Sequence, residues 1–209
     1  ACAPYRRLHV CDKNMEKMDA NNYDSGKATH TLLAEVCMAA KYEGNSIDTH
    51  YTEHKLTNPG TASQLCTALA RSFADIGDII RGKDLYLGDD KKDKEQRDEI
   101  EKNLKKYFQQ IHEEVTKGGT NGELQKRYQD KNGGNFFKLR EDWWTANRET
   151  VWKALTCDAR DNADDKYFRK TACGEGTTST QGKCRCPSHK VPTYFDYVPQ
   201  YLRWFEEWA

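Results

Sequence analysis

The chain has 209 residues, with 33 Lys or Arg and 33 Asp or Glu, so its formal net charge is zero. This balance argues against a general nucleic-acid-binding protein, which carries a basic excess, but it leaves room for one local basic patch. The chain contains no run of about 18 apolar residues, so no membrane-spanning helix is predicted. Charged residues make up 32% of the chain, which leaves a small hydrophobic core for its length.

Eight cysteines are the expected support for this small core. In an exported protein such a number indicates disulfides, whereas in a reducing cytosol it would indicate metal sites. Zinc at Cys184, Cys186 and His189 is the weaker alternative because a fourth ligand is not evident. The favoured disulfide joins Cys66 to Cys157. The cysteines expected to be oxidised are Cys2, Cys11, Cys37, Cys66, Cys157, Cys173, Cys184 and Cys186.

Residues 1–60 are predicted to form an N-terminal subdomain. Its first part, residues 1–27, combines two cysteines with Asp and Asn clusters, which indicates irregular structure pinned by disulfides. An apolar period of three and four residues then predicts one helix over 28–42, which is expected to end before Gly44. We interpret residues 45–60 as a polar loop, since they lack apolar periodicity and end in Asn-Pro-Gly.

Residues 61–209 are predicted to form a second, helical-bundle subdomain. Three strongly periodic stretches predict helices over 61–81, 94–117 and 136–156. Gly82 stands where a C-terminal cap belongs, and Gly77 inside the same helix suggests close packing against a neighbour. No stretch has a clear period of two. The sequence therefore predicts a mainly α protein, a disulfide-linked helical bundle with long irregular loops.

The helix over 136–156 is expected to be central. Two apolar stripes run along it, so it should pack on more than one side. Trp143, Trp144 and Trp152 lie on these stripes and are expected to be buried, because each can remove a large apolar surface from water.

The last part of the chain divides at about residue 194. Residues 158–193 are rich in Asp, Gly, Thr and Ser, which predicts a long irregular loop cross-linked by cysteines. Residues 194–209 begin a further helix, whose apolar stripe is formed by Val198, Tyr201, Leu202 and Phe205. Because the chain begins without Met and this helix has no final cap, we expect a fragment of a larger exported protein whose membrane anchor lies elsewhere.

One motif carries possible catalytic chemistry. His50, Glu53 and His54 match H-x-x-E-H, the inverted zinc-peptidase pattern. That chemistry needs both histidines on one helical face, a glutamate base and a third protein ligand. Because the motif falls in the predicted polar loop, we interpret it as exposed polar side chains and expect no catalytic residue, metal or cofactor. A secreted zinc hydrolase remains the alternative function.

Basic side chains form weak clusters among interleaved acids, which usually indicates a solvated face. The sharper hypothesis is a site for a sulfated glycan, formed if the loop after residue 157 folds over the basic side of the helix at 94–117. The expected ligand-binding residues are Lys102, Lys105, Lys106, Lys166, Arg169 and Lys170.

Four stretches resemble one protein family. These are ACAPYRRLHVCDKN at 1–14, ARSFADIGDIIRGKDLYLG at 70–88, LREDWWTANR at 139–148 and YFDYVPQYLRWFEEWA at 194–209. Together they resemble the Duffy-binding-like domain, in particular the N-terminal alpha-type domain of Plasmodium falciparum erythrocyte membrane protein one. The resemblance spans the whole chain, but the family's third, helical subdomain is absent from it.

The resemblance implies a disulfide-linked helical adhesin, part of a larger membrane protein on the surface of infected red cells. Such domains bind host cell-surface receptor proteins or glycans, among them heparan sulfate, blood-group sugars and complement receptor. They serve rosetting, cytoadherence and malaria virulence, and their antigenic variation escapes antibodies. Binding of this kind needs no catalysis, no cofactor and no nucleic acid.

Overall fold

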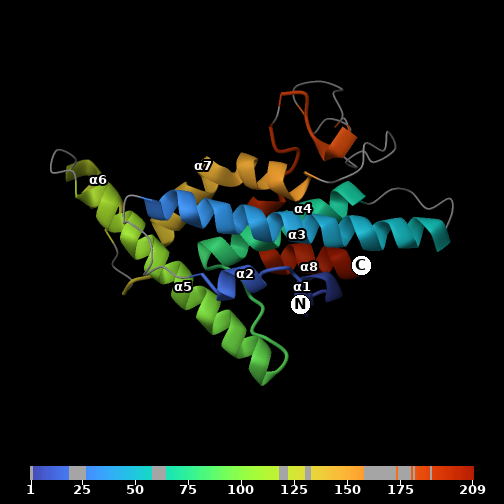
Figure 1. Ribbon diagram of the computed structural model, residues 1–209, viewed down its shortest axis with the longest axis horizontal. Coiled ribbons are helices and arrows are strands. Elements are labelled where there is room, and N and C mark those ends of the chain that lie inside the picture. Colours follow the sequence, from blue (N-terminus) through green and yellow to red (C-terminus); the bar gives the residue numbers. More distant parts are fainter. Residues whose placement is uncertain are drawn as a thin grey trace.

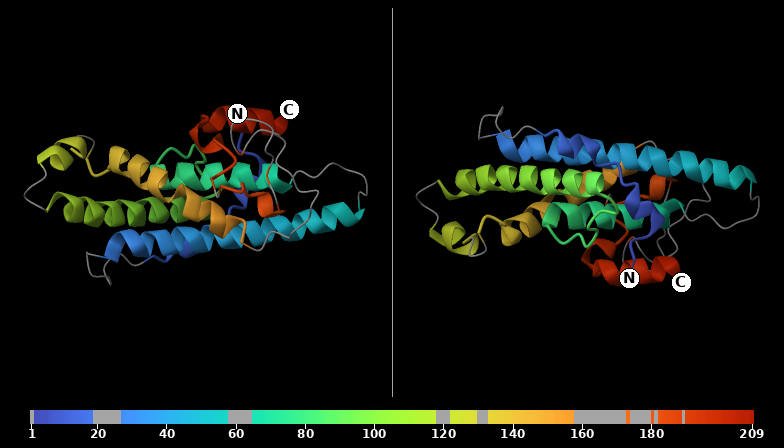
Figure 2. Two further views of the ribbon diagram at one scale, coloured as in Figure 1. Left: turned by 90° about the horizontal axis from the view of Figure 1, so that it is seen from above. Right: turned by 90° about the horizontal axis from the view of Figure 1, so that it is seen from below.

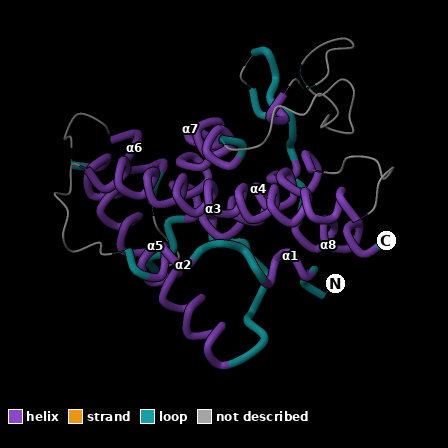
Figure 3. The backbone as a smooth tube through the Cα atoms, turned by 45° about the vertical axis from the view of Figure 1, so that its right-hand side comes forward, coloured by secondary structure: helices purple, strands orange, loops and turns teal. Residues whose placement is uncertain are grey.

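The computed structural model describes residues 2–18, 27–57, 65–117, 122–129, 133–157, 173, 180, 182–188 and 190–209. Across these residues the fold is built from helices, with no strand among them (Figure 3). The mainly α prediction is confirmed. No helix in the described part of the chain is long and apolar enough to cross a bilayer.

The longest helix, α3 (Ala28–Thr57), lies along the long axis of the molecule (Figure 1). The prediction that a helix ends before Gly44 and gives way to a polar loop is wrong. Gly44 lies against the end of α7, where an added Cβ would come 1.9 Å from the Leu155 carbonyl oxygen. The glycine therefore serves close helix packing, and Ile47 and Tyr51 beyond it pack against the core.

Helices α4 (Leu65–Arg81) and α7 (Phe137–Leu155) pack against α3 and against each other. Gly77 of α4 lies against Trp144, and a Cβ there would come 2.7 Å from the indole ring. The close packing expected at this glycine is present. Gly82 has a φ of +70°, and Lys83 N–H donates to Asp78 O at 2.8 Å, which caps α4 as predicted.

The three tryptophans of α7 are buried, as predicted. Trp144 and Trp152 both lie near the Phe73 ring, with centroids 5.1 and 5.2 Å away. Trp143 packs edge-on against Phe108 of α5. The central position predicted for this helix is therefore confirmed.

Helix α5 (Lys91–Thr116) runs beside the N-terminal half of α3 and is followed by the short α6 (Gly122–Arg127), as Figure 2 shows. Asp90 caps α5 by accepting a hydrogen bond from Asp93 N–H. Its periodic apolar residues form one face, buried at Ile100, Leu104, Tyr107, Phe108 and Ile111 and partly buried at Val115.

The N-terminal segment contains two short helices, α1 (Tyr5–Leu8) and α2 (Lys13–Glu16). Cys2, Cys11 and Cys37 carry free thiols, so the expected disulfide pinning of residues 1–60 is not what holds it. Ion pairs of Arg6 and Arg7 and burial of Met15 hold it instead. One hydrophobic core contains residues from both sides of position 60; the division at that position stays a prediction.

The described disulfides join Cys66 to Cys184 and Cys173 to Cys186. The predicted Cys66–Cys157 pair is wrong, because Cys157 is an exposed free thiol at the end of α7. Residue 184 returns to the core instead, where its carbonyl oxygen accepts a hydrogen bond from Trp152 Nε1. Four of the eight cysteines are therefore oxidised in the structure, not all eight.

The final helix, α8 (Gln200–Trp208), packs on α4, and both chain ends lie on this side of the molecule (Figures 1 and 2). It follows a short 3-10 turn, η3 (Phe195–Tyr197). Trp208 Nε1 donates to the Cys2 carbonyl oxygen, which joins the two ends. The described part of the long loop contains one further 3-10 turn, η2 (Gly182–Cys184).

Candidate functional site

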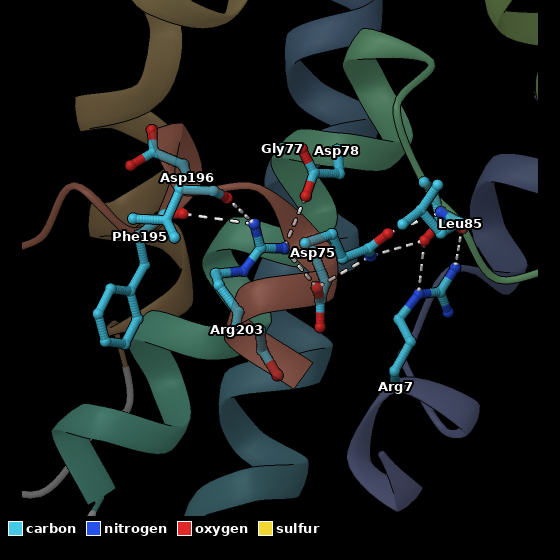
Figure 4. A network of polar contacts seen from close by, with 12 residues as sticks. Arg7, Asp75, Gly77, Asp78, Leu85, Phe195, Asp196 and Arg203 are labelled. Atoms are coloured by element: carbon cyan, nitrogen blue, oxygen red, sulfur yellow. Dashed lines mark hydrogen bonds and ion pairs between the residues drawn. The ribbon is translucent and has the colours of Figure 1, made fainter. Parts of the chain in front are cut away.

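A buried network of charges joins three stretches that are far apart in the sequence (Figure 4). Arg203 of α8 extends one guanidinium nitrogen to two carboxylates of α4, at 2.7 Å from Asp75 and 2.6 Å from Asp78. Arg6 of α1 reaches the second oxygen of Asp75 at 2.7 Å. Residues 1–14, 70–88 and 194–209, noted above for their resemblance, therefore meet around Asp75.

Further polar contacts extend this network toward α1. Arg7 pairs with Asp84 at 2.5 Å, and both side chains are buried. Gln200 donates to Asp75 at 3.1 Å and to Asp84 at 2.8 Å, so it links the two carboxylates. Arg81 donates to Asp78 and to the backbone oxygen of Asp196.

The charges in this network shift the pKa values of its carboxyl groups in opposite directions. Burial alone would raise the pKa of Asp75, but Arg6 and Arg203 outweigh it and hold that pKa below its usual value. Burial dominates at Asp78 and raises its pKa, although Arg203 and Arg81 offset part of the effect. Buried charges are tolerated only when paired, so we assign the network a structural role that holds α1, α4 and α8 together.

The structure places three of the six residues predicted for a glycan site next to one another. Lys102, Lys105 and Lys106 line a shallow hollow of about 540 Å³ on the outer side of α5. Its other wall comes from Gly133, Gly134 and Phe136, at the start of α7, and sequence reasoning did not identify this wall. Lys166, Arg169 and Lys170 lie outside the described residues. The three lysines share a face because they are spaced i, i+3 and i+4 on the helix, but this spacing does not indicate the wall opposite them.

Acidic neighbours reduce the positive charge of the hollow without cancelling it. Lys102 pairs with Glu99 at 2.9 Å, and Lys105 lies 3.9 Å from Glu101. Glu101 is already bound by both terminal nitrogens of the buried Arg140, at 3.0 and 3.1 Å. Lys106 forms no ion pair with a described residue. Three lysines and two carboxylates, Asp98 and Glu101, line the hollow, which leaves one net positive charge among its lining residues.

A family model described as the Duffy binding domain matches residues 1–203. The chain belongs to this family. The resemblance noted in the sequence is thereby confirmed, and the match extends across all four stretches that carried it. No match was found among curated proteins.

Solved structures support the same family membership. The NTS-DBL1(alpha-1) domain of Plasmodium falciparum membrane protein 1 (PfEMP1), varO strain, is 45% identical with a TM-score of 0.77, over 100% of this chain and 43% of that one. The NTS-DBL1-alpha and CIDR-gamma double domain from varO is 46% identical with a TM-score of 0.76, over 100% of this chain and 27% of that one.

A PfEMP1 DBLbeta domain that binds ICAM-1 is 32% identical with a TM-score of 0.69, over 97% of this chain and 41% of that one. This Duffy-binding domain chain therefore spans less than half the length of these solved relatives. Its likeness to the alpha-type domains, predicted from the sequence, is confirmed by their higher identity.

The H-x-x-E-H motif of this Duffy-binding domain lies on α3, not in the expected loop. His50 and Glu53 are exposed at 78% and 71%, with His50 Nδ1 3.8 Å from Glu53 Oε2. Within the described ranges no three His, Cys, Asp or Glu side chains are placed to hold a metal ion. The third protein ligand that a hydrolytic zinc site needs is therefore not provided by the described residues.

Helix α8 turns two polar side chains and one tryptophan inward and exposes its other apolar residues. Gln200, Arg203 and Trp204 are buried in contact with α4 and the network. The stripe that sequence reasoning identified as apolar is exposed, namely Val198, Tyr201, Leu202 and Phe205. The buried carboxylates of α4 explain this orientation, because Arg203 and Gln200 must point inward to pair with them.

Proposed function

We propose that this Duffy-binding domain is a host-cell adhesion module of a variant parasite surface protein. Family membership carries the proposal, supported by solved PfEMP1 DBLbeta relatives that bind ICAM-1. The domain binds a host cell-surface receptor protein, for example of the complement-receptor class, or a glycan such as heparan sulfate or a blood-group sugar, and does so without turnover. It acts on the infected red cell, in rosetting or cytoadherence, and its sequence variation limits recognition by antibodies.

For a sulfated glycan, we propose the hollow on α5 as the contact surface. Lys102, Lys105 and Lys106 converge there, and Lys106 is not engaged by any described carboxylate. Lys166, Arg169 and Lys170 complete the site in this proposal, from the segment that follows α7. Lysine ammonium groups at such a surface act as a charge cluster, so affinity should fall as salt screens them.

Heparin chromatography of the folded chain tests this site. The double substitution Lys105→Glu and Lys106→Glu should lower the salt concentration of elution, because it turns the hollow negative. The matched control is Lys91→Glu with Lys92→Glu, which changes the net charge equally about 20 Å away on the same helix. Circular dichroism should show unchanged helicity in both variants.

Three results separate the possibilities. A lower elution salt only for the Lys105 and Lys106 variant supports the hollow. Equal elution of both variants indicates non-specific charge attraction and removes the hollow from the proposal. If the unaltered chain is not retained near physiological salt, an array of receptors and neutral glycans becomes the decisive experiment, and failure to bind any of them would contradict adhesion by this chain.

A further inference from the structure

Two histidines of α3 face one groove of the molecule. The groove has a volume of about 1110 Å³ and lies between α3, α1 and the last turn of α8. His50 and His54 line it from α3, and Tyr5 and His9 line it from the α1 segment. Residues four apart on a helix lie on the same face, about 5–6 Å apart at Cβ. The continuation of α3 past Gly44 therefore places both imidazoles on one wall of the groove.

The neighbouring carboxylate favours metal ligation by His50. Glu53 Oε2 lies 3.8 Å from Nδ1 of this imidazole. At this distance the carboxylate makes no hydrogen bond to the ring, but its negative charge beside the imidazole attracts a cation. Histidines spaced i and i+4 on a helix are an established arrangement for holding a transition-metal ion. Imidazole nitrogens suit Zn²⁺, Cu²⁺ and Ni²⁺ rather than Mg²⁺ or Ca²⁺.

We propose that His50 and His54 bind one divalent transition-metal ion from the groove side. The ion takes two imidazole nitrogens from the protein, and water fills its remaining positions. A cluster of three ligands is absent from the described residues, so the site binds a metal without the ligand set of a hydrolytic centre. Affinity should follow the general order for nitrogen ligands, with Cu²⁺ tighter than Ni²⁺ or Zn²⁺.

Isothermal titration with CuCl₂, NiCl₂ and ZnCl₂ tests the proposal on the full 209-residue chain. The protein should carry no affinity tag, and its thiols should be alkylated, because Cys2 and Cys157 are exposed and would bind metal themselves. One equivalent should bind. His50→Ala or His54→Ala should weaken binding at least about tenfold, since loss of even an outer-shell partner costs about 10–100-fold.

His30→Ala is the matched control, because His30 is exposed on the same helix without a second histidine one turn away. This variant should bind metal as the unaltered chain does. The proposal fails if the unaltered chain binds none of the three ions. It also fails if the double variant His50→Ala with His54→Ala binds metal as tightly as the unaltered chain. A third contrary result would be His30→Ala weakening metal binding as much as His50→Ala or His54→Ala does. Circular dichroism of each variant separates loss of the site from loss of the helix.

Discussion

Replacing Arg203 with Ala tests whether the buried network holds α8 in place. The side chain is 3% exposed and is the contact that Asp75 and Asp78 share. Its removal leaves each buried carboxylate with one arginine partner, Arg6 for Asp75 and Arg81 for Asp78. Breaking a buried pair by removing one partner costs about 3–5 kcal/mol. For a chain of this length, that corresponds to a fall of about 6–20 °C in the thermal midpoint.

The loss should depend on pH, and both carboxyl groups predict the same sign. The folded-state pKa of Asp78 is already raised by burial, and loss of Arg203 raises it further. In the variant the charged Asp78 carboxylate therefore destabilises the fold fully above that pKa, and protonation removes this cost as the pH falls through it. The folded-state pKa of Asp75 is lowered, so in the unaltered chain its carboxylate stabilises the fold at pH values above its unfolded pKa. The variant loses the part of this stabilisation that came from Arg203. The stability deficit should therefore be larger at pH 7 than at about pH 3, which lies below the usual Asp pKa of 3.8.

Thermal and urea unfolding at the two pH values measure this deficit. Glu206→Gln is the control, because it removes another α4–α8 ion pair, with Arg71 at 2.8 Å, whose glutamate is 58% exposed. Exposed pairs contribute about 0–1 kcal/mol. If Arg203→Ala lowers the unfolding free energy no more than Glu206→Gln does, or if its deficit is the same at both pH values, the reasoning about buried charge is refuted.

Three further predictions concern packing and cysteine chemistry. Gly77→Ala should destabilise by about 1–3 kcal/mol, because the new methyl group meets Trp144 and overpacking outweighs the gain in helix propensity; a stabilised variant in urea unfolding would contradict the contact. Peptide mapping should find Cys66 joined to Cys184, a bridge over 118 residues that contributes about 4–5 kcal/mol in the chain-entropy model; recovery of Cys66 with another cysteine would refute it. Burial and the nearby Glu43 raise the pKa of Cys11 to about 11, so at pH 8 iodoacetamide should modify Cys11 far more slowly than the exposed thiol of Cys2, and equal rates would show that the Cys11 thiol is not shielded.

The candidate surfaces could be predicted only where the signal is local. Lys102, Lys105 and Lys106 share a face because their spacing matches one helical turn, and this holds whatever the helix packs against. The wall from Gly133 to Phe136 could not be predicted, because it reaches the hollow through the packing of α7 on α5. The helical setting of His50 was missed for a similar reason: Gly44 signals a helix end locally, but here it serves a contact with Leu155.

The sequence by itself indicated the mainly α class, the family and three helices, predicted over 61–81, 94–117 and 136–156 and found at 65–81, 91–116 and 137–155. It could do so because a period of 3.6 residues and a capping glycine are properties of neighbouring residues. Only the tertiary structure decided the partner of Cys66 and the orientation of α8. Disulfide pairing depends on which segments meet in space, and residue 184 meets α4 where Cys157 does not. Helix α8 exposes its apolar stripe because the carboxylates of Asp75 and Asp78, placed by another helix, must be paired, and that requirement outweighs burial of its own Tyr201 and Phe205.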